Sequence, residues 1–209
     1  ISFPKSEKFL VVDCTGVNKS EKLLEPYFER KASYVLISAP IESPNVQNIV
    51  YGINHQSIDT SAYKIFTAAS CTTNCLAPIV KVLEENIGIK HGSITTIHNI
   101  TNSQTIVDAP KNNLRRSRSG INSLIPTTTG SARAISLIYP ELKGRLNGHA
   151  VRVPLLNASL TDCVFEMKQN VEVDKINKLF NEASNTYLRN VLYYEEKPLV
   201  SSDYVNNPH

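Results

Sequence analysis

The sequence lacks tryptophan, has a single methionine, and shows no G-x-G-x-x-G pattern among its 8 glycines. No apolar run reaches the ~18 residues of a membrane-spanning helix, so we expect no membrane partner. The 4 cysteines are irregularly spaced, which fits neither a disulfide framework nor a zinc site, and we expect no metal. Because no secretory signal pattern opens the chain, we expect a reducing, cytoplasmic location.

Charge of either sign is also modest. Lysine and arginine total 22 and aspartate and glutamate total 19, which gives a net charge of +3. Such a small excess does not by itself indicate a nucleic acid or a membrane. The densest basic stretch, Lys111–Arg118, has no interleaved aromatic residues for base stacking, so nucleic acid is the weakest interpretation of it. A solvated surface and a specific anion site are the alternatives.

The remaining composition is ordinary for a globular protein. The 209 residues are 41% hydrophobic and 20% charged, which suits one large or two small domains. The apolar runs Phe9–Asp13 and Tyr34–Ser38, with a helical pattern over Lys19–Lys31 that Asn18 could cap, predict a parallel βαβ unit. Two further short strands are expected, at Ile49–Gly52 and Lys64–Thr67. The first third of the chain therefore indicates an α/β arrangement.

The rest of the chain predicts an α+β arrangement, a mixed or antiparallel sheet with helices on one face. Residues 99–123 carry no element of their own, and a loop of that length is usually functional or disordered. Ser93–His98 alternates as a strand, and Ala150–Leu156 and Ser159–Met167 alternate as antiparallel strands. The other expected elements are helices at Cys75–Asn86, Ser131–Ile138 and Val173–Tyr187, the last capped by Asp174, and short strands at Leu192–Tyr194 and Val200–Val205.

The decapeptide Ala68–Ala77 (A-A-S-C-T-T-N-C-L-A) contains the strongest candidate for chemistry. A strand that turns sharply into a helix would place Cys71 at the helix N-terminus, where backbone N–H groups and the helix dipole favour a thiolate. Ser70 and Thr72 add hydroxyls beside any anion held there. A buried structural cysteine among small neighbours explains the decapeptide about equally well.

The sequence S-C-T-T-N-C-L-A-P around Cys71 resembles the active-site signature of glyceraldehyde-3-phosphate dehydrogenases. His98 resembles the histidine partner of that family, and it follows Cys71 by 98 − 71 = 27 residues. The resemblance continues through Arg152-Val-Pro to about Tyr204. It implies that residues 1–70 are a remnant of an NAD-binding domain with a partial Rossmann-type sheet, and that residues 71–209 are a truncated catalytic domain.

The resemblance also implies roles for individual residues. Cys71 would be the nucleophile and His98 the base in the phosphorylating oxidation of a phosphorylated triose aldehyde, with inorganic phosphate as co-substrate and a homotetramer as the assembly. NAD is the expected cofactor, with NADP left open, and Thr15, Gly16, Ser38 and Ala39 would lie near it. The substrate and phosphate contacts would come from Ser70, Thr72, Thr101, Arg116, Thr129, Gly130 and Arg152.

Two departures from the family pattern point to a particular branch. Leu155-Leu156 replaces the usual polar residue and proline, and Asn99-Ile-Thr follows the histidine. Both are similar to an arsenic-resistance branch of the family, in which arsenate is thought to replace phosphate as the acyl acceptor. We expect Arg152 to point toward the Cys71 pocket, because a charged side chain in an apolar strand needs a partner.

Both ends of the sequence suggest a fragment. Ile1 is not a start methionine, and the chain closes on Asn-Asn-Pro-His. If the resemblance holds, the Gly-rich half of the nucleotide domain and the carboxy-terminal strand and helix are missing. The competing interpretation of the function is therefore a non-catalytic fragment or a partner-binding remnant of such an enzyme.

Overall fold

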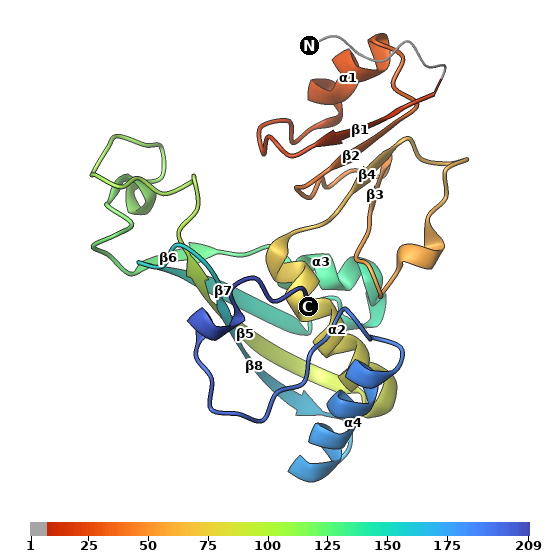
Figure 1. Cartoon of the computed structure of the whole chain (residues 1–209), viewed down its shortest axis with the longest axis vertical. Helices are drawn as coiled ribbons and strands as arrows, with labels where there is room; N and C mark the ends of the chain where they lie inside the picture. Colours follow the sequence, from red (N-terminus) through yellow and green to blue (C-terminus); the bar gives the residue numbers. More distant parts are fainter. Residues whose placement is uncertain (1–7) are drawn as a thin grey trace. The chain divides into compact units, whose positions relative to one another are not determined.

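The computed structural model describes residues 8–209, which form two compact units (Figure 1). The division falls between Asn74 and Cys75, inside helix α2 (Cys71–Asn86). Each unit contains its own four-stranded sheet. The expected functional division of the chain at residue 70 stays a prediction. No helix within residues 8–209 has the length and apolar character needed to cross a membrane.

The first unit is a parallel sheet, as the βαβ pattern predicted. Its strands lie in the order β1-β2-β4-β3, and every neighbouring pair is parallel. Helix α1 (Glu21–Glu29) connects β1 to β2. The α/β class expected for this part is confirmed. The strand bounds are β1 (Leu10–Asp13), β2 (Tyr34–Ile37), β3 (Val46–Asn48) and β4 (Ile65–Thr67).

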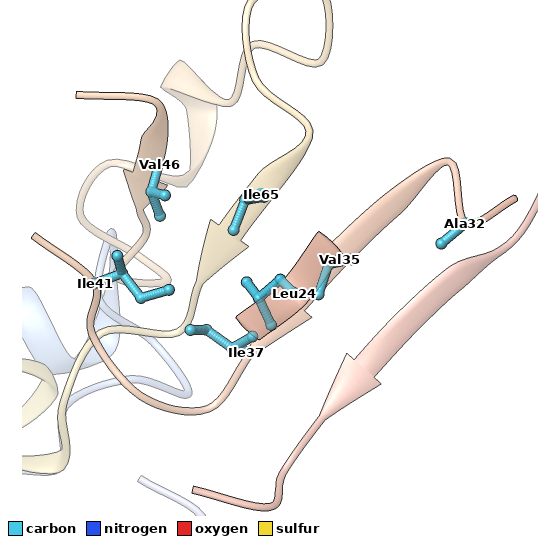
Figure 2. Packing of buried hydrophobic residues seen from close by; sticks show 7 residues of the cluster. All are labelled: Leu24, Ala32, Val35, Ile37, Ile41, Val46 and Ile65. Atoms are coloured by element: carbon cyan, nitrogen blue, oxygen red, sulfur yellow. The ribbon is translucent and has the colours of Figure 1, made fainter. Parts of the chain in front are cut away.

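The core of this unit forms where α1 covers the sheet. Leu24 of α1 is fully buried and lies among Val35 and Ile37 of β2 and Ile65 of β4 (Figure 2). A continuous apolar strand is typical of a parallel sheet buried on both faces, which explains why β2 was readily found in the sequence.

Two local predictions in this unit were wrong, and side-chain amides explain both. Asn18 does not cap α1, which begins at Glu21 after Ser20; its amide donates to Asp13 instead, at 2.7 Å. The strand expected at Ile49–Gly52 lies earlier, at β3. Asn54 accepts a hydrogen bond from Val50 N–H at 2.7 Å and donates to Asn48 at 3.0 Å, so a turn replaces further sheet pairing.

The second unit contains a mixed sheet in the order β6-β7-β5-β8. We expected the two strands after residue 149 to be antiparallel strands, but β5 (Ile89–Asn99) lies between them. β7 (Leu146–Val153) is parallel to β5, because the intervening chain includes helix α3 (Ser131–Ile138) and makes a crossover. β6 (Ile125–Thr128) and β8 (Leu160–Met167) are the antiparallel edges.

The helices of the second unit follow the predicted amphipathic patterns more closely than the chain's last segment does. α2 buries Leu76, Ala77 and Val80, and Gly88 ends it in the left-handed conformation at φ 83°. α4 spans Val173–Asn185, but its N-cap residue is Glu172 and Asp174 lies in the first turn.

The two strands expected near the end of the chain are absent from the described residues. Ser201–Tyr204 forms a 3-10 turn instead, because Asp203 accepts a hydrogen bond from Val200 N–H at 2.8 Å. Leu192–Tyr194 has no regular secondary structure.

Candidate active site

Three of the expected site segments meet at one edge of the first unit's sheet. Thr15-Gly16 follows β1, Ser38-Ala39 follows β2, and Ala68–Cys71 follows β4. Since these strands are parallel and adjacent, their carboxyl ends lie together. Backbone hydrogen bonds join the segments: Ser38 N–H donates to Asp13 O at 3.0 Å, and Ala68 N–H donates to Ile37 O at 2.9 Å. This edge is where open α/β sheets bind their ligands.

The turn from β4 into α2 is sharp. Ala69 is buried and adopts a left-handed backbone conformation at φ 54°, which is costly for a residue with a Cβ atom and is often found at functional sites. Ser70 then caps the helix, because its Oγ accepts from Thr73 N–H at 3.1 Å. Cys71 is the first residue of α2 and is exposed. The sequence predicted this position for Cys71, but gave no sign of the strained alanine.

A buried carboxylate organises the turn that follows β1. Asp13 accepts hydrogen bonds from Thr15 N–H at 2.8 Å and Thr15 Oγ1 at 2.6 Å, and also from Asn18 at 2.7 Å and Tyr27 at 3.0 Å. Burial alone would raise the pKa of Asp13, but these hydrogen bonds outweigh it and leave the pKa lowered. Gly16 follows at φ 69° with open space where a Cβ would lie. The turn can therefore approach a ligand closely.

In the second unit, His98 of β5 contacts Arg152 of β7. The two residues are register partners on these parallel strands. Arg152 Nη1 lies 2.8 Å from His98 Nδ1, and both atoms lie close to the carbonyl oxygen of Asn99, at 3.0 Å and 2.8 Å respectively. His98 is 5% exposed. The strand register thus brings together a predicted base and a predicted phosphate ligand.

The two segments that depart from the family pattern contact each other. Ile100 N–H donates to Leu155 O at 2.9 Å, and the Asn99 side-chain amide donates to Leu156 O at 3.1 Å. Ser159 Oγ accepts from Asn99 N–H and donates to Asn99 Oδ1, each at 3.2 Å. The departures therefore form one structural feature, next to the His98–Arg152 contact.

Thr101 lies in a tight turn that Gln104 closes. Gln104 N–H donates to Thr101 O at 2.9 Å, and Gln104 Oε1 accepts from Thr101 N–H at 3.1 Å. Thr101 Oγ1 and Ser103 Oγ lie 3.3 Å from the same oxygen. Gln104 is 8% exposed, and its Nε2 is buried with no hydrogen-bond partner within the described residues. Gln104 was not among the residues predicted from the sequence, in which only its place three residues after Thr101 could have indicated it.

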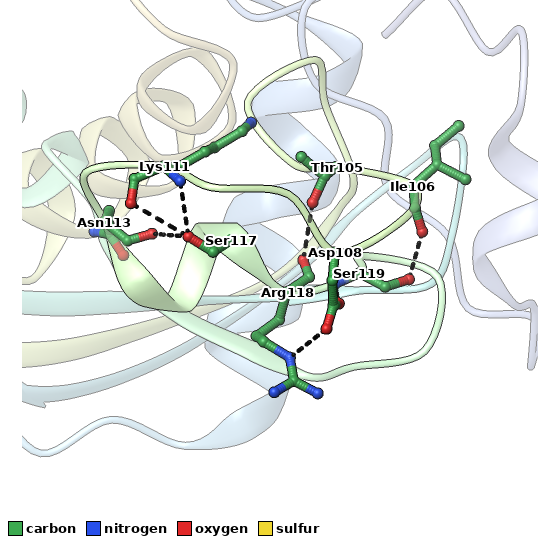
Figure 3. A network of polar contacts seen from close by, with 8 residues as sticks. All are labelled: Thr105, Ile106, Asp108, Lys111, Asn113, Ser117, Arg118 and Ser119. Carbon is green, nitrogen blue, oxygen red and sulfur yellow. Dashed lines mark hydrogen bonds and ion pairs between the residues drawn. The ribbon is translucent and has the colours of Figure 1, made fainter.

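The segment Thr105–Ser119 has little regular structure but many polar contacts (Figure 3). Asp108 accepts from Ser119 N–H at 2.7 Å and pairs with Arg118 at 3.1 Å. Ser117 Oγ accepts from Lys111 N–H at 3.1 Å and lies 3.3 Å from two backbone carbonyls. These polar contacts, and not an apolar core within the loop, define the loop's conformation.

The loop presents Arg116 to the neighbouring strand β6. Arg116 lies in the 3-10 turn Leu114–Ser117, which Asn113 caps, and its Nη2 donates to Thr127 Oγ1 at 3.2 Å. Thr129 and Gly130 come next in the chain, and Thr129 Oγ1 lies 3.1 Å from Ser131 Oγ at the start of α3. Arg116 and the P-T-T-T-G-S segment are therefore adjacent, as a shared anion site requires.

The other cysteines lie in different surroundings from Cys71. Cys75 Sγ donates to Thr161 Oγ1 on β8 at 3.7 Å. Cys163 lies on the same strand, where burial, followed by the proximity of Cys75 and Asp162, raises the pKa of its thiol to about 11. The 4 cysteines are not joined in disulfides, and no cluster of metal-binding side chains occurs in the part of the chain that the structure describes.

Comparison with known proteins shows the family of the chain. Residues 70–209 match the family model for the glyceraldehyde 3-phosphate dehydrogenase C-terminal domain. The chain belongs to the glyceraldehyde-3-phosphate dehydrogenase family. Among curated relatives, it is similar to glyceraldehyde-3-phosphate dehydrogenase 3 of a Nostoc species, with 56% identity over 200 residues, which is 95% of this chain and 59% of that protein.

Relatives from Bacillus species give the same picture. Glyceraldehyde-3-phosphate dehydrogenase 1 of Bacillus cereus is 45% identical over 93% of this chain and 58% of its own length. Glyceraldehyde-3-phosphate dehydrogenase 1 of Bacillus subtilis is 44% identical over 99% of this chain and 62% of its own length. The chain thus spans about three fifths of the length of these members of the glyceraldehyde-3-phosphate dehydrogenase family.

Within the glyceraldehyde-3-phosphate dehydrogenase family frame, the expected site residues fall into three groups. Cys71, Ser70 and Thr72 lie in the first unit beside the expected cofactor residues. His98, Arg152 and Thr101 cluster around the end of β5, and Arg116, Thr129 and Gly130 cluster around β6. The joining of these groups into one pocket, including the expected approach of Arg152 to Cys71, stays a prediction.

Proposed function

We propose that this chain carries the catalytic machinery of an NAD-dependent, phosphorylating oxidation of glyceraldehyde 3-phosphate. The contact between His98 and Arg152 is the observation that supports this most directly. It brings His98, the base in this proposal, within 2.8 Å of the Arg152 guanidinium at the ends of two parallel strands, and a phosphorylated aldehyde needs both a base and a positive charge. Family membership supplies the chemical class.

In this proposal Cys71 is the nucleophile. Its position at the first residue of α2 favours the thiolate, because the N–H groups of the first turn and the helix dipole stabilise negative charge. The thiolate adds to the aldehyde carbon, and the aldehyde oxygen takes up the proton that the thiol has released and becomes a hydroxyl. His98 then accepts the hydroxyl proton as the hydride departs, which gives a thioester on Cys71.

A bound nicotinamide dinucleotide would supply the hydride acceptor. The residues present fit such a group, because Thr15, Gly16, Ser38 and Ala39 lie at the carboxyl ends of adjacent parallel strands and Gly16 has open space beside it. Asp13 fixes the Thr15 hydroxyl and so orients that edge.

An oxyanion completes the proposed reaction. Its oxygen attacks the thioester carbon, the Cys71 thiolate leaves, and an acyl phosphate or acyl arsenate is released. We place the substrate phosphate at Arg152 and Thr101 and the attacking oxyanion at Arg116, Thr129 and Gly130, with Ser70 and Thr72 lending hydroxyls near the thiolate. We include arsenate as an alternative acceptor because residues 99–100 and 155–156, which contact each other, resemble the arsenic-resistance branch. We further propose a homotetramer in the cytoplasm.

Trapping the thioester tests the proposal. The protein is incubated with glyceraldehyde 3-phosphate and NAD without phosphate, and intact and peptide mass spectrometry locates the acyl group. We expect it on Cys71, with release on addition of phosphate or arsenate, and none in Cys71→Ser. Cys75→Ser is the matched control and should still be acylated. Acylation of Cys75 instead, or acylation that survives in Cys71→Ser, would overturn the assignment.

Alkylation gives a second, cofactor-independent test. Iodoacetamide near neutral pH should label Cys71 much faster than Cys14 or Cys75, and Cys163 should be slowest because its pKa is raised to about 11. Equal labelling of the four thiols would contradict a thiolate at Cys71.

A further inference from the structure

Three atoms at the end of β5 lie so close together that no arrangement of protons suits all of them. His98 Nδ1, Arg152 Nη1 and the Asn99 carbonyl oxygen are separated by 2.8, 2.8 and 3.0 Å. The guanidinium can only donate hydrogen bonds and the carbonyl can only accept them. Only the imidazole nitrogen can change its role, because its proton can move to Nε2.

Each neutral tautomer of His98 leaves one unfavourable contact. With the proton on Nδ1, His98 and Arg152 both donate to Asn99 O, but two donors then face each other at 2.8 Å. With the proton on Nε2, Arg152 donates to both Nδ1 and Asn99 O, but two acceptors then face each other at 2.8 Å. The second arrangement has two charge-assisted hydrogen bonds and the first has one, so the second is favoured while Arg152 stays in place.

The carbonyl cannot move away to relieve this conflict. Asn99 N–H donates to Ser159 Oγ at 3.2 Å, and the Asn99 side chain bonds to Leu156 O at 3.1 Å and Ile100 O at 3.0 Å. The main chain at the end of β5 is therefore fixed on both sides. Arg152, at the end of a flexible side chain, is the partner that can leave.

We infer that a phosphate bound by Arg152 switches His98 into its base form. This inference rests on the proposed function, in which Arg152 binds the substrate phosphate. As the guanidinium turns to the phosphate, Nδ1 can hold a proton and donate to Asn99 O, and Nε2 loses its proton to solvent and becomes the acceptor. One proton is gained and one is lost, so the imidazole stays neutral. Arg152 thus acts as a positioning residue for His98, and an unphosphorylated aldehyde would leave the base masked.

Nitrogen NMR of the ¹⁵N-histidine-labelled chain tests the switch, because protonated and unprotonated ring nitrogens have widely separated resonances. The probes are glycerol 3-phosphate and inorganic phosphate, and His98→Asn identifies the His98 signals by their loss. Without an anion, Nδ1 of His98 should be mainly unprotonated. Saturation with either probe should change the tautomer ratio by roughly tenfold toward protonated Nδ1.

Two variants make the result interpretable. Arg152→Gln should hold His98 with Nδ1 protonated whether or not an anion is present, and unchanged signals from the other histidines and an unchanged thermal midpoint would show that it folds. Arg145→Gln, the same change at an exposed arginine of the same unit, should behave as the wild type does. Guanidinium resonances of Arg152 report phosphate binding separately.

The outcomes separate this inference from the proposed function. If phosphate perturbs Arg152 while the His98 tautomer ratio stays constant, the switch is overturned and the phosphate assignment survives. If saturating glycerol 3-phosphate leaves Arg152 unperturbed, the assignment of the substrate phosphate to Arg152 and the switch are both overturned. A tautomer ratio in Arg152→Gln equal to that of the anion-free wild type would also overturn the switch.

Discussion

The two arginines assigned to anion binding are held in different ways. Arg152 lies on β7, where its register with His98 of β5 fixes the position of its backbone. Arg116 lies on a loop whose conformation depends on side-chain contacts such as those of Asp108 and Ser117. A strand fixes a side chain through a ladder of backbone hydrogen bonds, whereas this loop depends on a few polar side chains. Perturbations should therefore stay local in the loop but reach His98, the proposed base, in the strand.

The largest effect should come from His98, at the centre of the strand-held region. In the active enzyme, His98→Asn should slow dinucleotide reduction by ~10²–10⁴-fold, the usual contribution of general acid–base catalysis. Single-turnover rates measure this, and His149→Asn, at an exposed histidine on β7, is the control and should stay within about twofold of the wild type. An unchanged rate in His98→Asn would reduce His98 to a buried structural histidine.

The two arginines should respond to different substrates. Arg152→Ala should raise KM for glyceraldehyde 3-phosphate by ~10–100-fold while changing that for unphosphorylated glyceraldehyde much less, since it removes charge-assisted hydrogen bonds to the phosphate. Arg116→Ala should instead raise KM for inorganic phosphate or arsenate. Arg115→Ala, at the exposed neighbour, should leave both unchanged. If Arg152→Ala and Arg116→Ala affect the same substrate, the two assigned anion sites are one.

Asp13 depends on both strand pairing and side-chain hydrogen bonds, because it is the last residue of β1 and its carboxylate also fixes the turn that follows. Asp13→Asn should lower the free energy of unfolding by about 1–3 kcal/mol at neutral pH, since an amide cannot accept all four donors. The folded-state pKa of Asp13 is lowered from 3.8. Its stabilisation is therefore full above pH ~4 and is lost as the pH falls through the folded value. Urea titrations at neutral and strongly acidic pH measure this.

The control for Asp13 is Asp59→Asn, because Asp59 is exposed and its pKa is also lowered, chiefly by a hydrogen bond from Ser61. It should have a much smaller effect on unfolding. A wild-type advantage over Asp13→Asn that persists in strong acid would show that the carboxylate charge is not the cause.

The contrast between strands and side-chain-held loops also explains which parts of the structure the sequence could predict. Apolar alternation and a strand-to-helix pattern found β2 and the position of Cys71 at the start of α2, because these depend on residue type at short spacing. The sequence patterns did not reveal that β5 lies between β7 and β8, since strand order depends on contacts between residues that are far apart in the sequence.

Hydrogen-bonded turns were the least predictable parts. The side-chain amides of Asn18 and Asn54 form hydrogen bonds with partners that the hydrophobic pattern of the sequence does not predict. The same is true of the hydrogen bond from Thr101 N–H to Gln104. The resemblance to the family predicted the site residues, but the contact of Asn99 with Leu156 could be found only from the structure.

Gln104 offers a test within the turn that carries Thr101. Gln104→Met keeps the length of the side chain but removes the oxygen that accepts from Thr101 N–H. We expect affinity for glycerol 3-phosphate to fall roughly tenfold, because Thr101 would no longer be held in position. Amide hydrogen exchange of Thr101 should accelerate as well. Gln169→Met, at an exposed glutamine of the same unit, is the matched control, and equal losses in the two variants would exclude a positioning role.

The smallest effect should come from Asp108, which holds the loop that carries Arg116. Asp108→Ala leaves the N–H of Ser119, a residue only 7% exposed, without its acceptor and removes a solvent-exposed ion pair with Arg118. Amide exchange of Ser119 and Gly120 should accelerate, and KM for inorganic phosphate should rise by about threefold.

Amides of β5 and the His98-dependent rate should stay unchanged in Asp108→Ala, because the ladder between β5 and β7 does not include the loop. Asp162→Ala, at an exposed carboxylate on β8, controls for the loss of a surface charge. If exchange in β5 accelerated as much as exchange in the loop, the two regions would open as a single unit, and Arg116 would depend on the same scaffold as Arg152.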